Sequence, residues 1–171
     1  MNVTHGRVLV KGNTVSRAKP RRADYILYYK PNLPIAVVEA KDNTHSVGAG
    51  MQQALAYAEM MDIPFVFSSN GDGFLLHDRS GNYDPMEREL SLSEFPRPVD
   101  LWTRYRKWKG LDERKEQIVT QNYYVDEVGK APRYYQLNAI NRTIEAIANG
   151  QNRVLLVMAT GTGKTYTAFQ I

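Results

Sequence analysis

The segment from Arg153 to Thr165 constrains the fold of this 171-residue chain more than any other feature. It runs from a mostly apolar stretch (RVLLVMA, 153–159) into a loop with two glycines and a lysine (TGTGKT). Such a stretch predicts a buried strand, and the loop should open a helix. The backbone N–H groups of a loop of this kind can surround phosphates. The segment therefore predicts an α/β unit that holds a nucleotide.

The side chains of this loop have separate predicted roles. Lys164 should reach the β- and γ-phosphates of ATP, and Thr165 should hold Mg²⁺. The general phosphate-loop pattern has glycine where Met158 stands. The form MATGTGKT resembles motif I of superfamily 2 helicases and of the motors of type I and type III restriction enzymes. The candidate cofactor-binding residues of the loop are Thr160, Gly161, Thr162, Gly163, Lys164 and Thr165.

A helix from about 133 to 149 is predicted before this segment, because its apolar residues recur on one face and Gly150 can end it. Those residues are Leu137, Ile140, Ile144 and Ile147. Its first turn (RYYQ, 133–136) resembles the adenine-reading Q motif. The resemblance implies that Gln136 forms hydrogen bonds with the base. An ordinary helix start with buried tyrosines fits the same residues, and both interpretations stay open.

The first 90 residues predict a mixed α/β domain. Strands are expected at short runs of β-branched, aromatic and apolar residues, and a helix where apolar residues recur at spacings of three and four. The expected elements are strands 7–11 (the weakest), 23–29, 35–40, 65–69 and 73–77, and a helix at 47–61. The segment KPNLP should turn between the second and third strands, and Asn70 to Asp72 between the last two. Pro96 and Pro98 mark a boundary.

Asp24 and Glu39 are predicted to face each other across the first of these hairpins. Both lie equally far from the centre of the turn, between Pro31 and Asn32. Directly opposed residues have Cβ atoms roughly 4.5–5.5 Å apart. Lys41 lies two residues beyond Glu39 and should project from the same face.

Two opposed carboxylates repel each other unless a positive charge lies between them. Mg²⁺ suits such a site, and it can polarise a phosphoryl oxygen and lower the pKa of an attacking water. A neighbouring lysine could hold the nucleophile or the developing charge. A surface group in which Lys41 neutralises one carboxylate is the alternative, and the residues alone leave both open.

Four short patterns follow one another between about residues 8 and 78. They are Asp24 with Tyr25, Glu39 to Lys41 (EAK), Gln53 with Tyr57 (QALAY) and Ser69 to Gly71. In combination they resemble the PD-(D/E)xK nuclease fold, and more closely the nuclease domain in the R subunit of type I restriction enzymes. That family has a DY strand, an EAK strand, a QxxxY helix and a serine-asparagine-glycine turn.

The resemblance implies a role for each matching residue. Asp24 and Glu39 would be metal ligands, Lys41 would be catalytic, and Gln53 and Tyr57 would complete the site. Gln53 and Tyr57 also fit a pair that only stabilises its helix. The family usually has a helix before its first strand, often with a further acidic residue. The chain starts too late to contain that helix, so we expect an N-terminal truncation.

A basic, aromatic helix is expected from 101 to about 110, with Asp100 as its cap. Residues 97–115 include seven basic and three acidic residues, so this stretch carries the chain's whole net charge of +4. Such a surface could follow DNA phosphates. Alternatively, the aromatic residues could pack on the nuclease domain, which we favour, while the charges stay available for DNA. The residues are Trp102, Tyr105 and Trp108, with Arg104, Arg106, Lys107 and Lys109 between and beside them.

Composition excludes several classes of site. Without cysteine the chain has no disulfide scaffold, thiol nucleophile or cysteine-based zinc site. His5, His45 and His77 are scattered, so we expect no histidine-only metal site. No stretch of 18 apolar residues and no apolar signal core occurs, which predicts a cytoplasmic protein.

Together these features predict a restriction-endonuclease-like mixed sheet flanked by helices, followed by the first strand and phosphate loop of a RecA-like motor. The expected divisions are a nuclease domain at 1–92 (lacking its N-terminal helix), a helical and charged connector at 93–130 and the motor start at 131–171. The resemblance implies an R subunit that cuts double-stranded DNA with Mg²⁺ and translocates it with ATP. Its partners would be DNA and the methylation and specificity subunits.

Since the chain stops six residues after Thr165, we expect this fragment alone not to hydrolyse ATP. Two other hypotheses stay open. One is a different fusion of nuclease and helicase, as in type III restriction or DNA repair. The other is a DNA-binding or regulatory module whose carboxylates bind no metal.

Overall fold

The computed structural model describes residues 2–4, 8–11, 14–17, 21–124 and 131–171. The chain forms two compact units, each with its own buried core. The first unit extends to Leu27 and continues over Ala36–Pro96. The second comprises Tyr28–Ile35 and Arg97–Ile171.

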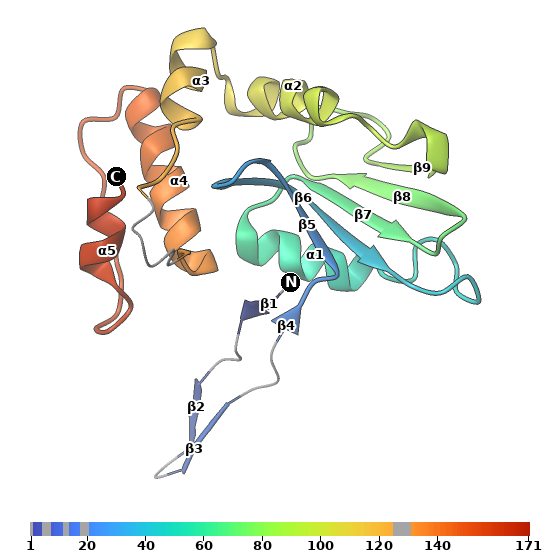
Figure 1. Ribbon diagram of the computed structural model, residues 1–171, viewed down its shortest axis with the longest axis horizontal. Coiled ribbons are helices and arrows are strands. Elements are labelled where there is room, and N and C mark those ends of the chain that lie inside the picture. Colours follow the sequence, from blue (N-terminus) through green and yellow to red (C-terminus); the bar gives the residue numbers. More distant parts are fainter. Residues whose placement is uncertain (1, 5–7, 12–13, 18–20, 125–130) are drawn as a thin grey trace. The chain divides into compact units, whose positions relative to one another are not determined.

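A five-stranded sheet with the order β5-β6-β7-β8-β9 carries the candidate nuclease residues (Figure 1). β6 and β7 are parallel, with Glu39 opposite Ser68, whereas β7 with β8 and β8 with β9 are antiparallel. Pro31 and Asn32 alone separate β5 from β6, and residues 70–72 join β7 to β8, so both predicted hairpins are confirmed. The strands are β5 (Tyr25–Lys30), β6 (Leu33–Ala40), β7 (Phe65–Ser69), β8 (Gly73–Asp78) and β9 (Glu87–Ser91).

Helix α1 (Met51–Met61) makes the crossover that two parallel strands require between β6 and β7. Its apolar residues recur at helical spacing and pack on one face of the sheet, against β7 (Figure 1). The helix begins at Met51 and not at 47, because residues 47–50 form turns. It ends at Asp62, which has a left-handed φ of 55°. The buried residues of α1 are Met51, Ala54, Tyr57, Ala58 and Met61.

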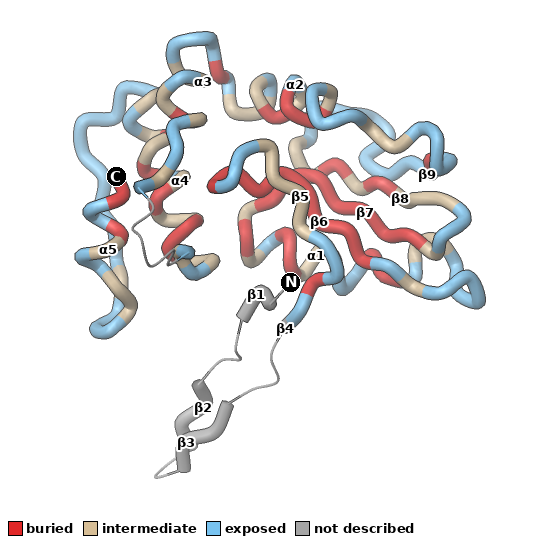
Figure 2. The backbone as a smooth tube through the Cα atoms, in the orientation of Figure 1, coloured by how far each residue is buried: buried red, intermediate tan, exposed pale blue. Residues whose placement is uncertain are grey.

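The core of the first unit lies along β6 and β7, which are buried over almost their whole length (Figure 2). A parallel pair of strands with both faces covered reads as a continuous apolar run, as IAVVEA and PFVFSS do here. Phe67 packs against Phe95 and Phe74, with ring centroids 4.8 and 6.2 Å apart. This rigid centre fixes the ends of β6 and β7, where the candidate residues lie.

Four short strands precede the sheet. β1 (Asn2–Thr4) pairs with β4 (Arg21–Arg22), and β2 (Val8–Lys11) pairs with β3 (Thr14–Arg17). β2 corresponds to the strand predicted at 7–11, of which Arg7 lies outside the described residues.

The second unit is helical. α4 contacts both α3 and α5, and its predicted bounds of 133 to 149 are confirmed to within one residue. The prediction that a helix opens at the glycine-rich loop is also confirmed. The helices are α2 (Pro98–Lys109), α3 (Glu113–Val119), α4 (Tyr134–Ala148) and α5 (Lys164–Phe169).

The strand predicted at 153–159 does not form, and this prediction was wrong. Residues 153–157 are exposed and irregular, with Leu155 and Val157 86% and 87% exposed. A strand of a parallel sheet gains its stability from neighbours that pair with its backbone and cover its side chains. No strand of the described residues pairs with this segment, so the apolar run forms no strand of its own.

Two smaller differences concern the boundary region. Strand β9, with the 3₁₀ turn η1 (Leu92–Glu94) after it, was not predicted, because ERELS buries only Leu90 on an edge strand. Helix α2 begins at Pro98 and not at 101, since proline fits the first helical position. Asp100 is therefore not the N-cap. It accepts a hydrogen bond from the Arg97 backbone N–H at 3.2 Å from inside the first turn.

Candidate active site

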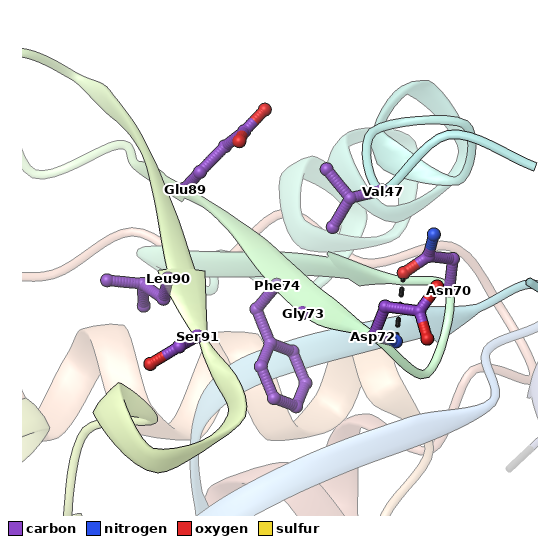
Figure 3. A pocket seen from close by; sticks show the side chains of 8 residues that line it. All are labelled: Val47, Asn70, Asp72, Gly73, Phe74, Glu89, Leu90 and Ser91. Carbon is purple, nitrogen blue, oxygen red and sulfur yellow. Dashed lines mark hydrogen bonds between the residues drawn. The ribbon is translucent and has the colours of Figure 1, made fainter.

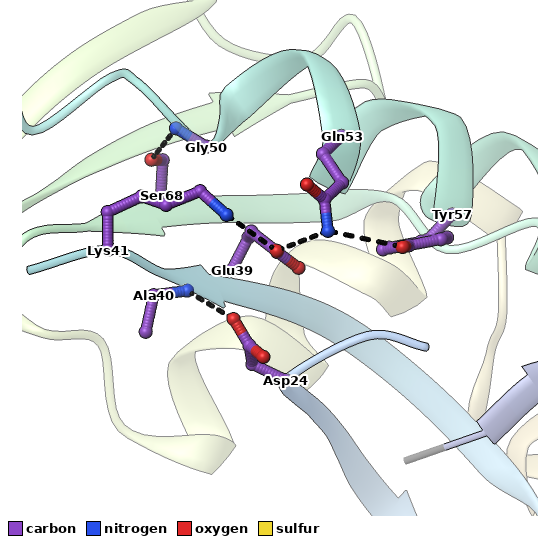
Figure 4. A network of polar contacts seen from close by, with 8 residues as sticks. All are labelled: Asp24, Glu39, Ala40, Lys41, Gly50, Gln53, Tyr57 and Ser68. Carbon is purple, nitrogen blue, oxygen red and sulfur yellow. Dashed lines mark hydrogen bonds and ion pairs between the residues drawn. The ribbon is translucent and has the colours of Figure 1, made fainter. Parts of the chain in front are cut away.

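Asp24, Glu39 and Lys41 come together where the β5–β6 hairpin opens (Figure 4). Glu39 is the second-last residue of β6, and Lys41 directly follows the strand. Asp24 lies one residue before β5, and its Oδ2 accepts a hydrogen bond from the Ala40 backbone N–H at 2.9 Å. Asp24 is exposed, whereas Glu39 is only 2% exposed. The site thus combines one exposed and one buried carboxylate.

The two oxygens of Glu39 have different surroundings. Oε1 accepts hydrogen bonds from Lys41 Nζ at 3.0 Å and from Gln53 Nε2. Oε2 is buried and forms no hydrogen bond within the described part of the chain, although the Asp24 backbone N–H lies near enough to the carboxylate to lower its pKa. A buried carboxylate oxygen without a partner costs free energy that an added cation would recover.

Burial raises the pKa of Glu39 above its usual value. The hydrogen bond from Lys41 lowers that pKa, and the negative charge of Asp24 raises it. The Asp24 carboxylate accepts its hydrogen bond from Ala40, the residue after Glu39, so the two negative charges lie near each other. A divalent cation between them would favour the charged form of both.

Gln53 and Tyr57 lie one turn apart on α1 and face the same carboxylate (Figure 4). The Gln53 Nε2 amide donates to Glu39 and also to the Tyr57 hydroxyl at 3.2 Å. Gln53 therefore joins the helix to the strand as well as to its own helix neighbour. A pair that only stabilised the helix would not need the contact with Glu39.

The donors suit a hard cation that keeps some of its waters. Among the residues that the structure describes, no three histidine, cysteine, aspartate or glutamate side chains gather at one point. Two carboxylates with water in the remaining positions form the kind of site that Mg²⁺ accepts, because it dehydrates reluctantly. The unpartnered Oε2 of Glu39 beside Asp24 fits that requirement.

The serine-asparagine-glycine turn holds the loop that follows Lys41. Asn70 Nδ2 donates to the His45 carbonyl at 3.0 Å, and Ser69 Oγ donates to the Gly73 carbonyl at 2.8 Å. Asp42 begins that loop, where hydrogen bonds from Thr44 and His45 lower its pKa to about 2. Through Asn70, the turn thus holds the loop that follows Lys41.

A pocket of about 430 Å³ lies beside this turn (Figure 3). It contains none of the predicted catalytic residues, and its two acidic side chains, Asp72 and Glu89, are exposed. It is therefore a hollow next to the site and not the site itself. Its lining residues are Val47, Asn70, Asp72, Gly73, Phe74, Glu89, Leu90 and Ser91.

Two residues of the glycine-rich loop have backbone conformations that favour glycine. Gly161 and Gly163 have φ values of 77° and 84°, which L side chains rarely adopt. Lys164 Nζ donates to the Met158 carbonyl at 2.9 Å, so its ammonium lies across the loop. Thr160 and Thr165 are exposed beside it. Thr162, the remaining loop residue, donates through its hydroxyl to the Ala159 carbonyl at 2.6 Å.

Gln136 contacts the phosphate loop directly. Its Nε2 donates to the Thr162 carbonyl at 3.0 Å, and its Oε1 accepts from the Arg133 backbone N–H at 2.9 Å. The side chain is 7% exposed. Both polar atoms are thus engaged by backbone groups, one at the start of α4 and one in the loop.

The aromatic residues of α2 pack inside the second unit. Trp102 stacks on Tyr29 with centroids 4.1 Å apart, and its Nε1 donates to Glu116 Oε1 at 2.6 Å. The Tyr105 hydroxyl donates to the buried Glu145. Part of the basic stripe is also engaged: Arg106 pairs with Glu116 at 3.0 Å, and Lys109 with Glu145 at 2.9 Å.

Sequence reasoning did not find two residues behind the carboxylate pair. Ser68 on β7 is fully buried, and its Oγ accepts a hydrogen bond from the Gly50 backbone N–H at 3.0 Å. The only signals were a serine inside an apolar strand and a glycine before a helix.

Two family models match the chain. The type I restriction enzyme R protein N terminus matches residues 9–84, and the res subunit of type III restriction enzymes matches residues 129–171. The chain is 54% identical over 167 residues to the EcoAI endonuclease subunit of Escherichia coli, covering 97% of the chain and 21% of that protein. It is 30% identical to the EcoKI endonuclease subunit of E. coli K12, covering 85% of the chain and 16% of that protein.

A solved structure has the same fold. It is a fragment described as an HsdR subunit of a type I restriction enzyme from Vibrio vulnificus YJ016, with a TM-score of 0.83 and 42% identity. The match covers 99% of this chain and 31% of the chain in that fragment structure. No helix among the described residues is both long and apolar enough to cross a bilayer. Over the fraction of those proteins that it spans, the chain belongs to the family of type I restriction enzyme R subunits.

Proposed function

We propose that the chain carries the nuclease site of a type I restriction enzyme and the start of its ATP-driven motor. The reaction would be Mg²⁺-dependent hydrolysis of double-stranded DNA, coupled to ATP hydrolysis. The observation that carries this proposal is the buried, unpartnered Oε2 of Glu39 beside the exposed Asp24 carboxylate. Most buried carboxylate oxygens have a partner, and a cation at Oε2 would supply one here.

Asp24 and Glu39 would hold the metal. When bound, Mg²⁺ would polarise the scissile phosphate and lower the pKa of the attacking water. Gln53 and Lys41 hold Glu39 Oε1, which fixes the carboxylate and leaves Oε2 for the ion. Lys41 is 29% exposed, so its ammonium can also meet a DNA phosphate. Tyr57 orients the Gln53 amide.

The second part of the proposal concerns nucleotide and partners. Lys164 would bind the β- and γ-phosphates, the backbone of residues 160–163 would surround them, and Thr165 would hold the Mg²⁺ of ATP. Gln136 would form hydrogen bonds with the adenine base, for which its side chain would have to leave the Arg133 N–H and the Thr162 carbonyl that it contacts here. We propose a nuclease domain at 1–92, a connector at 93–130 and a motor start at 131–171. The methylation and specificity subunits would recognise the DNA sequence.

The proposal predicts Mg²⁺ binding that depends on Glu39. We expect isothermal calorimetry on the chain to show binding that Glu39→Gln removes, because the variant loses the charge but keeps the shape. Glu59→Gln is the matched control, since Glu59 is exposed on α1 away from the carboxylate pair. Equal Mg²⁺ affinity of the wild type and Glu39→Gln would leave a non-catalytic module as the better reading.

A further prediction separates the charges of α2. Lys107 is exposed, whereas Arg106 is ion-paired with Glu116. If α2 follows DNA phosphates, Lys107→Gln should lower the slope of log affinity against log salt by about 0.9, the value for one phosphate contact. Arg106→Gln should instead lower the melting temperature, because it strips a partner from Glu116. An unchanged slope in Lys107→Gln would assign that charge to solvation.

A further inference from the structure

Gly50 is the N-cap of α1, but its conformation does not require glycine. Its φ is −87° and its ψ is −8°, which any residue can adopt. Space requires it. A Cβ at this position would lie 2.9 Å from Glu39 Cγ, closer than real Cβ atoms come, and 3.0 Å from Ser68 Oγ, tighter than most real contacts. Glycine is present because the first turn of α1 rests directly on the metal-site glutamate.

Neither neighbour has room to give way. Glu39 is 2% exposed and Ser68 is fully buried, and they are partners in the parallel ladder of β6 and β7. The Ser68 hydroxyl accepts the Gly50 N–H, which ties the start of α1 to β7 at this height. A bulkier residue at 50 would therefore move the helix start, the Glu39 side chain, or both.

The position of this turn determines where Gln53 lies. Gln53 follows Gly50 by three residues and donates to Glu39 Oε1. A shift of a few tenths of an ångström at Gly50 would change this contact, which is one of the two that hold Oε1 and orient the carboxylate. The other, from Lys41, comes from the end of β6 and does not depend on α1.

We propose that Gly50 and Ser68 are positioning residues of the nuclease metal site. They determine the distance between the start of α1 and strand β6. That distance in turn determines how the Glu39 carboxylate is oriented toward the cation. This inference rests on the proposed nuclease function. It assigns a role to two residues that do not themselves reach the metal.

The test uses Gly50→Ala, with Gly48→Ala as the matched control. A Cβ at Gly48 would meet only the Leu75 Cδ2 atom, at 3.0 Å, which is the far end of a flexible side chain. We expect Gly50→Ala to lower Mg²⁺ affinity about 10- to 100-fold, the usual effect of losing support behind a metal ligand. Gly48→Ala should bind like the wild type.

Two readouts without metal distinguish positioning from general destabilisation. In NMR spectra of the metal-free chain, the Gln53 side-chain amide protons should move toward free-amide shifts in Gly50→Ala and stay in place in Gly48→Ala. The melting temperature should fall further in Gly50→Ala than in Gly48→Ala, because its Cβ meets buried atoms, but Gly50→Ala should still be folded at the temperature of the binding measurement. Ser68→Ala, which removes the acceptor and adds no atoms, should weaken Mg²⁺ binding in the same direction and decides the matter if Gly50→Ala does not fold.

The outcomes are separable from the proposed function. If the wild type binds Mg²⁺ and Glu39→Gln does not, while Gly50→Ala and Ser68→Ala bind like the wild type, the positioning role is overturned and the nuclease site stands. If the wild type does not bind Mg²⁺ at all, both are overturned. Weakened binding together with a shifted Gln53 amide supports the positioning role.

Discussion

Replacing Glu39 by alanine is expected to abolish DNA cleavage by the complete R subunit and to leave ATP hydrolysis intact. The variant removes the one carboxylate that presents a buried free oxygen to the site. A bound metal supplies several kcal/mol to the transition state, and each 1.4 kcal/mol is a factor of ten, so cleavage should fall at least about 10³-fold. Linearisation of plasmid DNA and release of inorganic phosphate, measured on one preparation of the reconstituted enzyme, provide both numbers.

Asp24→Ala and Lys41→Ala should give the same result for different reasons. Asp24 would be the second ligand, whereas Lys41 holds Glu39 at 3.0 Å and faces solvent for the DNA phosphate. Glu59→Gln on α1 is the control that should cut normally. Normal cleavage by Glu39→Ala would remove the nuclease assignment, even if Mg²⁺ still bound elsewhere on the chain.

The sheet was predictable where the local pattern and the tertiary environment agree. The run IAVVEA lies between turn residues and is buried on both faces as β6, so its composition was sufficient. The hairpin at 70–72 follows from residues that favour tight turns. The same reasoning failed at 153–159, where RVLLVMA has the composition of a strand but no neighbour among the described strands. The composition of a segment indicates that its side chains favour burial, but the segment forms a strand only where a neighbouring strand pairs with it.

The part of the candidate site that could be predicted is the pairing of residues across the β5–β6 hairpin. Equal distances from the turn brought Asp24 and Glu39 to the same end of two strands, where the structure also has them. Their difference in burial could not be predicted, because it arises from α1 covering Glu39. The positioning roles of Gly50 and Ser68 could not be predicted for the same reason. The hydrogen bond between them joins residues 18 apart in sequence. It depends on how far the start of α1 lies from the sheet, which the local sequence does not indicate.

The last prediction concerns coupling between motor and nuclease. Lys164 is the cation of the phosphate loop, and its ammonium lies across that loop against the Met158 carbonyl. We expect Lys164→Ala in the complete R subunit to lower ATP hydrolysis about 10²- to 10³-fold, the usual loss when one electrostatic donor to a reacting group is removed. Mg²⁺ binding at Asp24 and Glu39 should not change, because Lys164 belongs to the other compact unit.

Cleavage by this same variant distinguishes two arrangements. If the nuclease needed only metal and DNA, cutting would continue, since every residue around Glu39 is intact. If cutting waits for translocation, as we propose for a type I enzyme, it should vanish together with ATP hydrolysis. Mg²⁺ binding, ATP hydrolysis and cleavage should therefore be measured on one Lys164→Ala preparation. If DNA cleavage continued without ATP hydrolysis, the nuclease site would act independently of the motor. The proposal that cleavage is coupled to translocation would then be wrong.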